Sequence, residues 1–137
     1  MLKYGLIHPP LMDAIGTAGH GSKVLIADGN YPYLTVKNES ARLIHLNVAP
    51  GLLGVGQVLQ PLMTAVNFEA ATIMGPDDGS PVDAHDEYRS LLGEGVPFER
   101  VDRWAFYELA RSADVGLVIA TGDERLFANL ILTVGLR

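Results

Sequence analysis

The stretch AGHGSKVLIADGNYP (residues 18–32) sets a single histidine, His20, between two glycines and ahead of an apolar run. The run VLIA (24–27) is short and wholly apolar, which predicts a buried strand. The residues DGNYP (28–32) are typical of the turn that leaves the end of such a strand. Because glycine tolerates backbone conformations that other residues avoid, the histidine can stand at a bend. The stretch therefore predicts a buried strand with a polar side chain at each end, a pattern common to binding sites and to plain turns.

Apolar spacing in the rest of the chain predicts helices and strands in alternation. Helices are expected over 9–18, 59–66 with an interruption or kink at Pro61, 85–92 and 106–113, and strands over 43–48, 69–74, 115–120 and 129–134. Residues 75–83 are rich in glycine, proline and aspartate and are a predicted loop. No repeat and no linker interrupts this order, so the sequence predicts a single α/β domain over residues 1–137.

Composition limits the classes of function. The chain has 137 residues, of which 48% are hydrophobic and 19% charged, and this balance predicts a globular protein rather than a disordered one. The net charge of −6 and the absence of a lysine or arginine run argue against nucleic acid or an anionic membrane surface as a partner. There is no cysteine, so disulfides and thiolate metal sites are excluded. With no signal-like or membrane-spanning apolar stretch, a cytoplasmic location is expected.

One acidic cluster suggests a metal site at first sight. The stretch VDAHDEYR (82–89) gathers Asp83, His85, Asp86 and Glu87. Adjacent residues on a helix point to different faces, however, and the pattern is not His-Glu-x-x-His. A solvated helix start, with its acids favoured by the helix dipole, is the better interpretation, and no metal is expected.

Three further features predict no site. The glycines of APGLLGVGQ (49–57) lack the Gly-Lys-Ser/Thr of a phosphate loop and the spacing of a dinucleotide fingerprint. His8 and His45 have no partner that the sequence identifies, so both are expected at the surface or on a strand face. No Gly-x-Ser-x-Gly elbow is present to supply a serine nucleophile.

Candidate chemistry is instead expected where polar residues flank the buried strands. His20 precedes and Asp28 follows the first strand, Arg103 stands at the start of the last helix, and the segment 121–129 joins the last two strands. Ligand sites of α/β sheets gather at such strand ends. From spacing alone, His20 is either a catalytic residue or a turn histidine bonded to backbone.

Five short motifs, taken together, carry a family resemblance. GHG (19–21), DGNYP (28–32), RWAFYELA (103–110), TGDERLFANLIL (121–132) and VGLR (134–137) occur in this order and spacing. In them the chain resembles the RbsD/FucU family of D-ribose pyranases and L-fucose mutarotases, from its first helix to its last strand. The resemblance implies a single compact α/β domain with a central, mainly parallel sheet flanked by helices. It also implies a homo-oligomeric ring, commonly a decamer, with sites between neighbouring subunits.

The resemblance assigns roles to individual residues. It makes His20 the proton donor and Asp28 and Arg103 binders of sugar hydroxyls, with Phe127, Ala128 and Asn129 completing the pocket. The arginine of RWAFYE favours the fucose branch, since ribose-type members tend to carry a histidine there. One departure stands out: the family usually has Tyr-x-Asn in the last loop, and this chain has Phe-Ala-Asn. The missing hydroxyl removes a hydrogen bond worth about 0.5–1.5 kcal/mol, which puts the sugar specificity and the rate in question.

The expected activity is that of a cofactor-free mutarotase acting on L-fucose or a similar monosaccharide. A histidine suits the proton transfers of ring opening and closing because its unperturbed pKa lies near neutrality. Two alternatives stay open: a D-ribose pyranase, and a non-catalytic sugar-binding protein of uptake or regulation. Residues 20–28, if extended, would span about 26 Å, much more than one sugar. Either the glycines curl His20 back toward the strand end, or the site is assembled from more than one chain.

Overall fold

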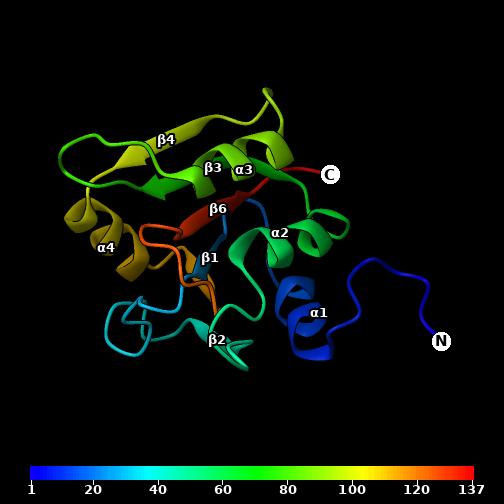
Figure 1. The fold of residues 1–137 in the computed structure, drawn as a ribbon. Helices are drawn as coiled ribbons and strands as arrows, with labels where there is room; N and C mark the ends of the chain where they lie inside the picture. Colours follow the sequence, from blue (N-terminus) through cyan, green and yellow to red (C-terminus); the bar gives the residue numbers. More distant parts are fainter.

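The computed structural model describes residues 1–137 and builds one six-stranded sheet with four helices (Figure 1). In chain order the elements are α1 (Pro9–Gly16), β1 (Lys23–Ala27), β2 (Arg42–His45), α2 (Val55–Met63), β3 (Phe68–Met74), α3 (Asp83–Leu92), β4 (Phe98–Val101), α4 (Arg103–Arg111), β5 (Val115–Ala120) and β6 (Leu130–Val134). None of these helices has the length and apolar character needed to cross a membrane.

The strand order across the sheet is β2-β5-β1-β6-β3-β4. β1 pairs with β5 in parallel, as do β2 with β5 and β3 with β4. Only β6 runs the other way, antiparallel to both β1 and β3. The predicted α/β domain with a mainly parallel sheet is confirmed, and the carboxyl ends of the five parallel strands share one edge of the sheet.

Both faces of the sheet are covered, which explains why its strands are apolar on both sides. On β1, Val24 and Ile26 belong to the core beneath α1, α2 and α3, whereas Leu25 and Ala27 belong to the core beneath α4. Figure 1 shows α4 on the opposite side of the sheet from the other three helices. β1 thus lies in the middle of the molecule, and the residues at its two ends reach opposite edges of the sheet.

Most elements lie where the apolar spacing predicts them, and three of them differ from the prediction. β4 was not predicted, because FERV carries charged Glu99 and Arg100 at its centre and forms an edge strand with both side chains exposed. The second strand ends at His45 rather than at residue 48, since the Val48 N–H turns back to the Leu46 carbonyl. The helix expected over 59–66 is α2, which begins earlier, at Val55, ends at Met63 and continues through Pro61 without an interruption.

Candidate functional site

A pocket of about 230 Å³ opens at the edge of the sheet where the parallel strands end. Its walls come from the residues after β1, from the end of β3, from the start of α4 and from the loop between β5 and β6, here called the 121–129 loop. The lining residues are Asp28, Asn30, Tyr31, Met74, Arg103, Tyr107, Leu126, Phe127 and Asn129. The structure thus brings together Asp28, Arg103 and two of the three candidates from the last loop, as expected for strand ends of an α/β sheet.

Asp28 and Asn129 form a reciprocal pair at the base of this pocket. The Asp28 N–H donates to Asn129 Oδ1 at 2.8 Å, and Asn129 Nδ2 donates to Asp28 Oδ2 at 2.8 Å. The backbone N–H groups of Asn30 and Ala128 also donate to the carboxylate, at 2.9 and 3.2 Å. Burial raises the pKa of Asp28, and the backbone hydrogen bonds oppose this only in part. Ala128, the third loop candidate, therefore reaches the pair through its N–H.

Phe127 and Arg103 close one side of the pocket. The Phe127 ring is half-buried, and the Arg103 guanidinium carbon lies 5.8 Å from the ring centre, within the range of a cation–π contact. The backbone of Phe127 has a φ of 59°, the left-handed region that costs a residue with a side chain about 1–2 kcal/mol. An apolar ring and a fixed positive charge thus face the same opening.

Two side chains of α3 hold the loop at this strained point. His85 Nε2 lies 2.9 Å from the Phe127 carbonyl oxygen, and the Tyr88 hydroxyl donates to the Ala128 carbonyl at 2.7 Å. The expectation of a solvated helix start is therefore wrong for His85, which is only 6% exposed, whereas Asp83 and Asp86 are exposed. The signal in the sequence was the spacing of Ala84, Tyr88 and the later leucines, which marks the buried face of α3 beside His85.

An ion-pair cluster anchors the start of the same loop. Arg125 donates to Asp123 through Nε at 2.9 Å and Nη2 at 2.6 Å, and its Nη1 lies 2.6 Å from Glu87 of α3. Asp123 also accepts the Val55 N–H at 2.9 Å, which caps the N-terminus of α2. Burial alone would raise the pKa of Asp123, but the hydrogen bonds from Arg125 and Val55 bring it below its ordinary value.

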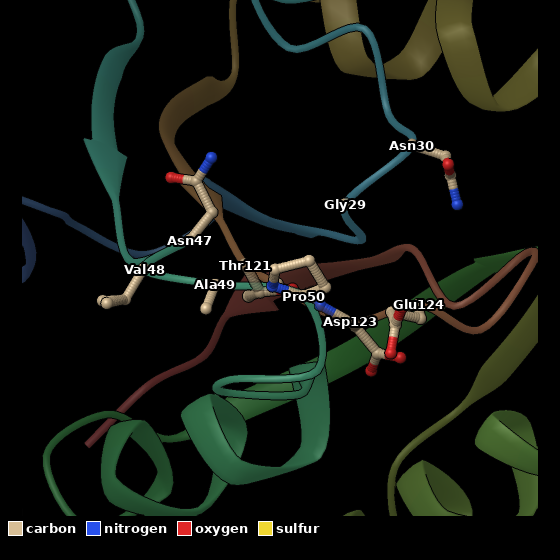
Figure 2. A pocket seen from close by; sticks show the side chains of 10 residues that line it. Gly29, Asn30, Asn47, Val48, Ala49, Pro50, Thr121, Asp123 and Glu124 are labelled. Carbon is tan, nitrogen blue, oxygen red and sulfur yellow. Dashed lines mark hydrogen bonds between the residues drawn. The ribbon is translucent and has the colours of Figure 1, made fainter.

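A second hollow, of about 460 Å³, lies beside the pocket at the ends of β1, β2 and β5. In Figure 2 the segment 47–50 faces the turn at Gly29 and Asn30 across this hollow, with Asp123 and Glu124 at its lower rim. The chain can pass so closely here only because residue 122 is glycine, since a Cβ there would collide with the carbonyl oxygens of Ala49 and Leu52. Asn30 lines both hollows.

His20 lies at the opposite edge of the sheet from the pocket. It stands before β1, in a turn tied to the end of β6 by the Gly21 N–H and the Val134 carbonyl, and glycine is required at residue 21 because its φ is 83°. β1 alone spans about 16 Å at 3.3 Å a residue. The glycines do not curl His20 back toward Asp28, so that alternative is wrong within one chain.

The His20 side chain is bonded to a carboxylate rather than to backbone. Its Nε2 lies 3.0 and 3.1 Å from the two oxygens of Glu69, which stands near the start of β3, and 53% of the His20 side chain is exposed. The sequence offered no signal for Glu69, which is 49 residues away. The exposed pair leaves the other ring nitrogen, Nδ1, free of this contact. No group of three or more His, Asp or Glu side chains in the structure could hold a metal ion.

Comparisons with known proteins give a consistent result. The model of the RbsD / FucU transport protein family matches residues 1–137. The chain is 32% identical over 143 residues to the fucose mutarotase of Homo sapiens, covering 95% of this chain and 89% of that protein. It is 30% identical over 141 residues to D-ribose pyranase 2 of Streptomyces griseus, covering 98% of each. The structure of Bacillus subtilis RbsD complexed with D-ribose superposes with a TM-score of 0.86 at 25% identity, over 100% of this chain and 99% of that chain.

Proposed function

This chain belongs to the RbsD/FucU family, and from that premise we propose that it is an isomerase, a cofactor-free mutarotase that interconverts the anomers of L-fucose or a similar monosaccharide. The observation that carries the proposal is the pocket built on the Asp28–Asn129 pair, with Arg103 and Phe127 facing its opening. We also propose that residues 1–137 act as one sugar mutarotase domain and that the protein works in the cytoplasm.

The pocket has the groups that a free sugar needs. The Asp28 carboxylate and the Asn129 amide keep hydrogen-bonding capacity beyond the bonds they make to each other, since a carboxylate oxygen and an amide can each form more than one bond. Arg103 offers donors to further hydroxyl groups, and the Phe127 ring offers an apolar face to the C–H groups of the sugar. Ala128 contributes its backbone, which fixes the orientation of Asp28. These residues bind and orient the sugar.

Anomer exchange is a proton-transfer reaction. The ring oxygen gains a proton while the anomeric hydroxyl loses one, the ring opens to the aldehyde, the C1–C2 bond rotates, and closure gives the other anomer. In this proposal His20 moves the proton, because imidazole both gives and takes protons near neutral pH. With Nε2 held by Glu69, Nδ1 is the ring nitrogen that faces the sugar.

The position of His20 supports a site shared between copies of the chain. His20 and the pocket lie at opposite edges of the sheet, so one chain does not supply both to the same sugar. Exposed apolar side chains near the pocket, Trp104 at 69% and Leu126 at 68%, are consistent with burial against a neighbour. We therefore propose a homo-oligomer, a decameric ring, in which His20 of one copy serves the pocket of the next.

A D-ribose pyranase is the second candidate, favoured by the identity to the Streptomyces griseus protein over 98% of both chains. Arg103 argues for the fucose type, because the ribose type tends to carry a histidine at this place. A non-catalytic sugar-binding protein is the third candidate, since Phe127 lacks the hydroxyl of the usual tyrosine. These three functions differ in two measurable properties, which sugar binds and whether its anomers exchange.

Exchange NMR with a panel of free sugars, including L-fucose and D-ribose, measures both properties in one sample. We expect L-fucose or a close relative to show faster anomer exchange with the protein than without it. His20→Ala should slow this exchange by about 10²–10⁴-fold, the usual contribution of a general acid. The matched control is His45→Ala, because His45 is also exposed but ends β2 and makes an edge contact with Tyr33. A His20→Ala protein that exchanges anomers at the unmodified rate would remove His20 from the reaction.

A further inference from the structure

Three side chains of α3 form hydrogen bonds or an ion pair with the 121–129 loop. His85 Nε2 lies 2.9 Å from the Phe127 carbonyl oxygen, the Tyr88 hydroxyl lies 2.7 Å from the Ala128 carbonyl oxygen, and Glu87 pairs with Arg125 at 2.6 Å. His85 and Tyr88 stand three residues apart on one face of the helix, so they meet two successive carbonyl groups of the loop. None of these three α3 side chains lines the pocket, so the loop is held by residues outside the pocket.

These contacts with α3 determine which backbone groups of the loop point toward Asp28 in the pocket. Because the carbonyls of residues 127 and 128 are bonded to α3, the Ala128 N–H is left to donate to Asp28 at 3.2 Å. The next residue, Asn129, then completes the reciprocal pair with Asp28. Phe127 has a left-handed backbone at the point where the loop contacts α3 on one side and Asp28 on the other. Such a conformation persists only where the surrounding contacts stabilise it.

Of the three contacts from α3, the one from His85 is made to Phe127, the residue with the left-handed backbone. A carbonyl oxygen can only accept, so the ring nitrogen facing Phe127 must carry a hydrogen. Burial lowers the pKa of His85, against smaller opposing effects from the Phe127 and Met74 carbonyls. The lowered pKa favours the neutral ring, and the carbonyl acceptor at Phe127 requires the hydrogen of that ring to be on Nε2.

We propose that His85 is a positioning residue of the sugar site. By donating its Nε2 hydrogen to the Phe127 carbonyl, it holds residue 127 in the left-handed conformation and thereby keeps Ala128 and Asn129 against Asp28. The consequence for sugar rests on the proposed function, whereas the hold on the loop is a property of the free protein. The experiments below separate the two.

The first experiment uses the unmodified protein without sugar. Nitrogen-15 NMR of the His85 ring should show a neutral imidazole with its hydrogen on Nε2, and this hydrogen should exchange slowly with water. A neutral ring with its hydrogen on Nδ1 would overturn the proposal, because Nε2 would then have nothing to donate.

The second experiment measures amide hydrogen exchange at Ala128, again without sugar. His85→Leu fills the space but cannot donate, whereas His85→Gln keeps a donor on a side chain of similar reach. We expect exchange at Ala128 to rise at least about tenfold in His85→Leu, the effect of losing one good hydrogen bond, and to return toward the unmodified rate in His85→Gln. Asn38→Ala is the matched control, since it removes a side-chain bond to the Val115 carbonyl at the far end of β5. Equal exchange at Ala128 in His85→Leu and Asn38→Ala would overturn the proposal.

The third experiment measures the kinetics of sugar exchange. In His85→Leu the KM should rise about tenfold with kcat within about threefold, because the pocket is loosened while the proton donor is untouched; His85→Gln should restore the KM. If the unmodified protein exchanges no sugar at all, the proposed function fails, and the Ala128 measurement still decides the role of His85. A KM in His85→Leu equal to that of Asn38→Ala would overturn the role at the sugar site.

Discussion

Phe127 combines a bulky side chain with a left-handed backbone, a conformation that mostly glycine adopts. Its ring and its carbonyl contact different residues: the ring lies against Arg103, and the carbonyl accepts a hydrogen bond from His85. The family resemblance implies a tyrosine at this place, and a tyrosine would have the same backbone cost as phenylalanine. Phe127→Tyr therefore adds one hydroxyl group at the same backbone cost.

Phe127→Tyr tests what that hydroxyl does. In the proposed mutarotase we expect tighter binding of fucose-like sugars or faster anomer exchange, by up to about tenfold, as one good hydrogen bond allows. The checks are exchange NMR and the melting temperature of the same variant. Phe98→Tyr is the control, because Phe98 is also half-buried but lies in β4, beneath Arg89. A loss of about 1–3 kcal/mol of stability with unaltered sugar handling would show that the ring packs as ordinary core.

Among the elements, α2 depends on a residue far away in the sequence. The N–H of Gly54, the residue before the helix, donates to Gln57 Oε1, and the Val55 N–H donates to Asp123 Oδ2, which lies 68 residues away in the sequence. Asp123 is nearly buried, and Arg125 and the helix N-terminus both favour its negative charge. The start of the 121–129 loop is therefore tied to α2, and its end is tied to α3. The two helices hold the loop in one shape without contributing to the pocket lining.

Asp123→Asn should weaken this tie. We expect a loss of about 1–3 kcal/mol in the free energy of unfolding at neutral pH, measured by urea denaturation, because the neutral amide loses the Arg125 ion pair and part of the cap. Since the pKa of Asp123 is lowered in the folded protein, its contribution is complete above the ordinary carboxyl value of 3.8. It is lost as the pH falls through the folded value, so the difference between variant and unmodified protein should shrink there.

Asp78→Asn is the comparison for this measurement. Asp78 also has a lowered pKa, from hydrogen bonds with Ser80, but it lies fully exposed in the loop before α3. Its replacement should leave the free energy of unfolding close to that of the unmodified protein, because the side chain is fully exposed. Equal losses in the two variants would show that Asp123 does not anchor α2.

At the scale of the whole molecule, the sheet separates two groups of polar residues. The His20–Glu69 pair lies where β1 and β3 begin, and the Asp28–Asn129 pair lies where β1 ends and β6 begins. β1 is rigidly paired on both sides, so no local motion brings the two groups together. A reaction that uses both groups therefore needs two copies of the chain.

Mixing two inactive variants tests the shared site. Arg103→Met removes a pocket residue from an exposed position, and His20→Ala removes the proton donor, so neither change disturbs the core. When the two variants are unfolded together and reassembled in equal amounts, roughly a quarter of the unmodified exchange rate should return. Each site then draws one pocket and one histidine at random in a symmetric oligomer. Sedimentation checks that assembly has occurred. A mixed oligomer no more active than its two parents would contradict a site shared between copies.

The sequence by itself determined the α/β class, nearly all of the elements and the cluster of candidates at the strand ends. These predictions follow from local properties of the chain. The period of the apolar residues distinguishes a helix from a strand, and the residue that follows a parallel strand lies at the carboxyl edge of the sheet. Asp28, which follows β1, and the segment 121–129, which follows β5, could be expected at the same edge for that reason, whereas the strand before Arg103 was not predicted. β4 escaped prediction because a short edge strand with charged side chains has no apolar period.

Only the tertiary structure decided which side chains meet across the fold. Glu69 reaches His20 over 49 residues and His85 reaches Phe127 over 42, and no spacing within the chain encodes either contact. The apolar spacing of Ala84 and Tyr88 places His85 beside the buried face of α3, but only the packed structure identifies the Phe127 carbonyl as its acceptor. The separation between His20 and the pocket is also a result of tertiary structure. β1 is paired with a strand on each side, and this pairing keeps it extended between the two groups. Local patterns select elements, and long-range packing selects the partners of each side chain.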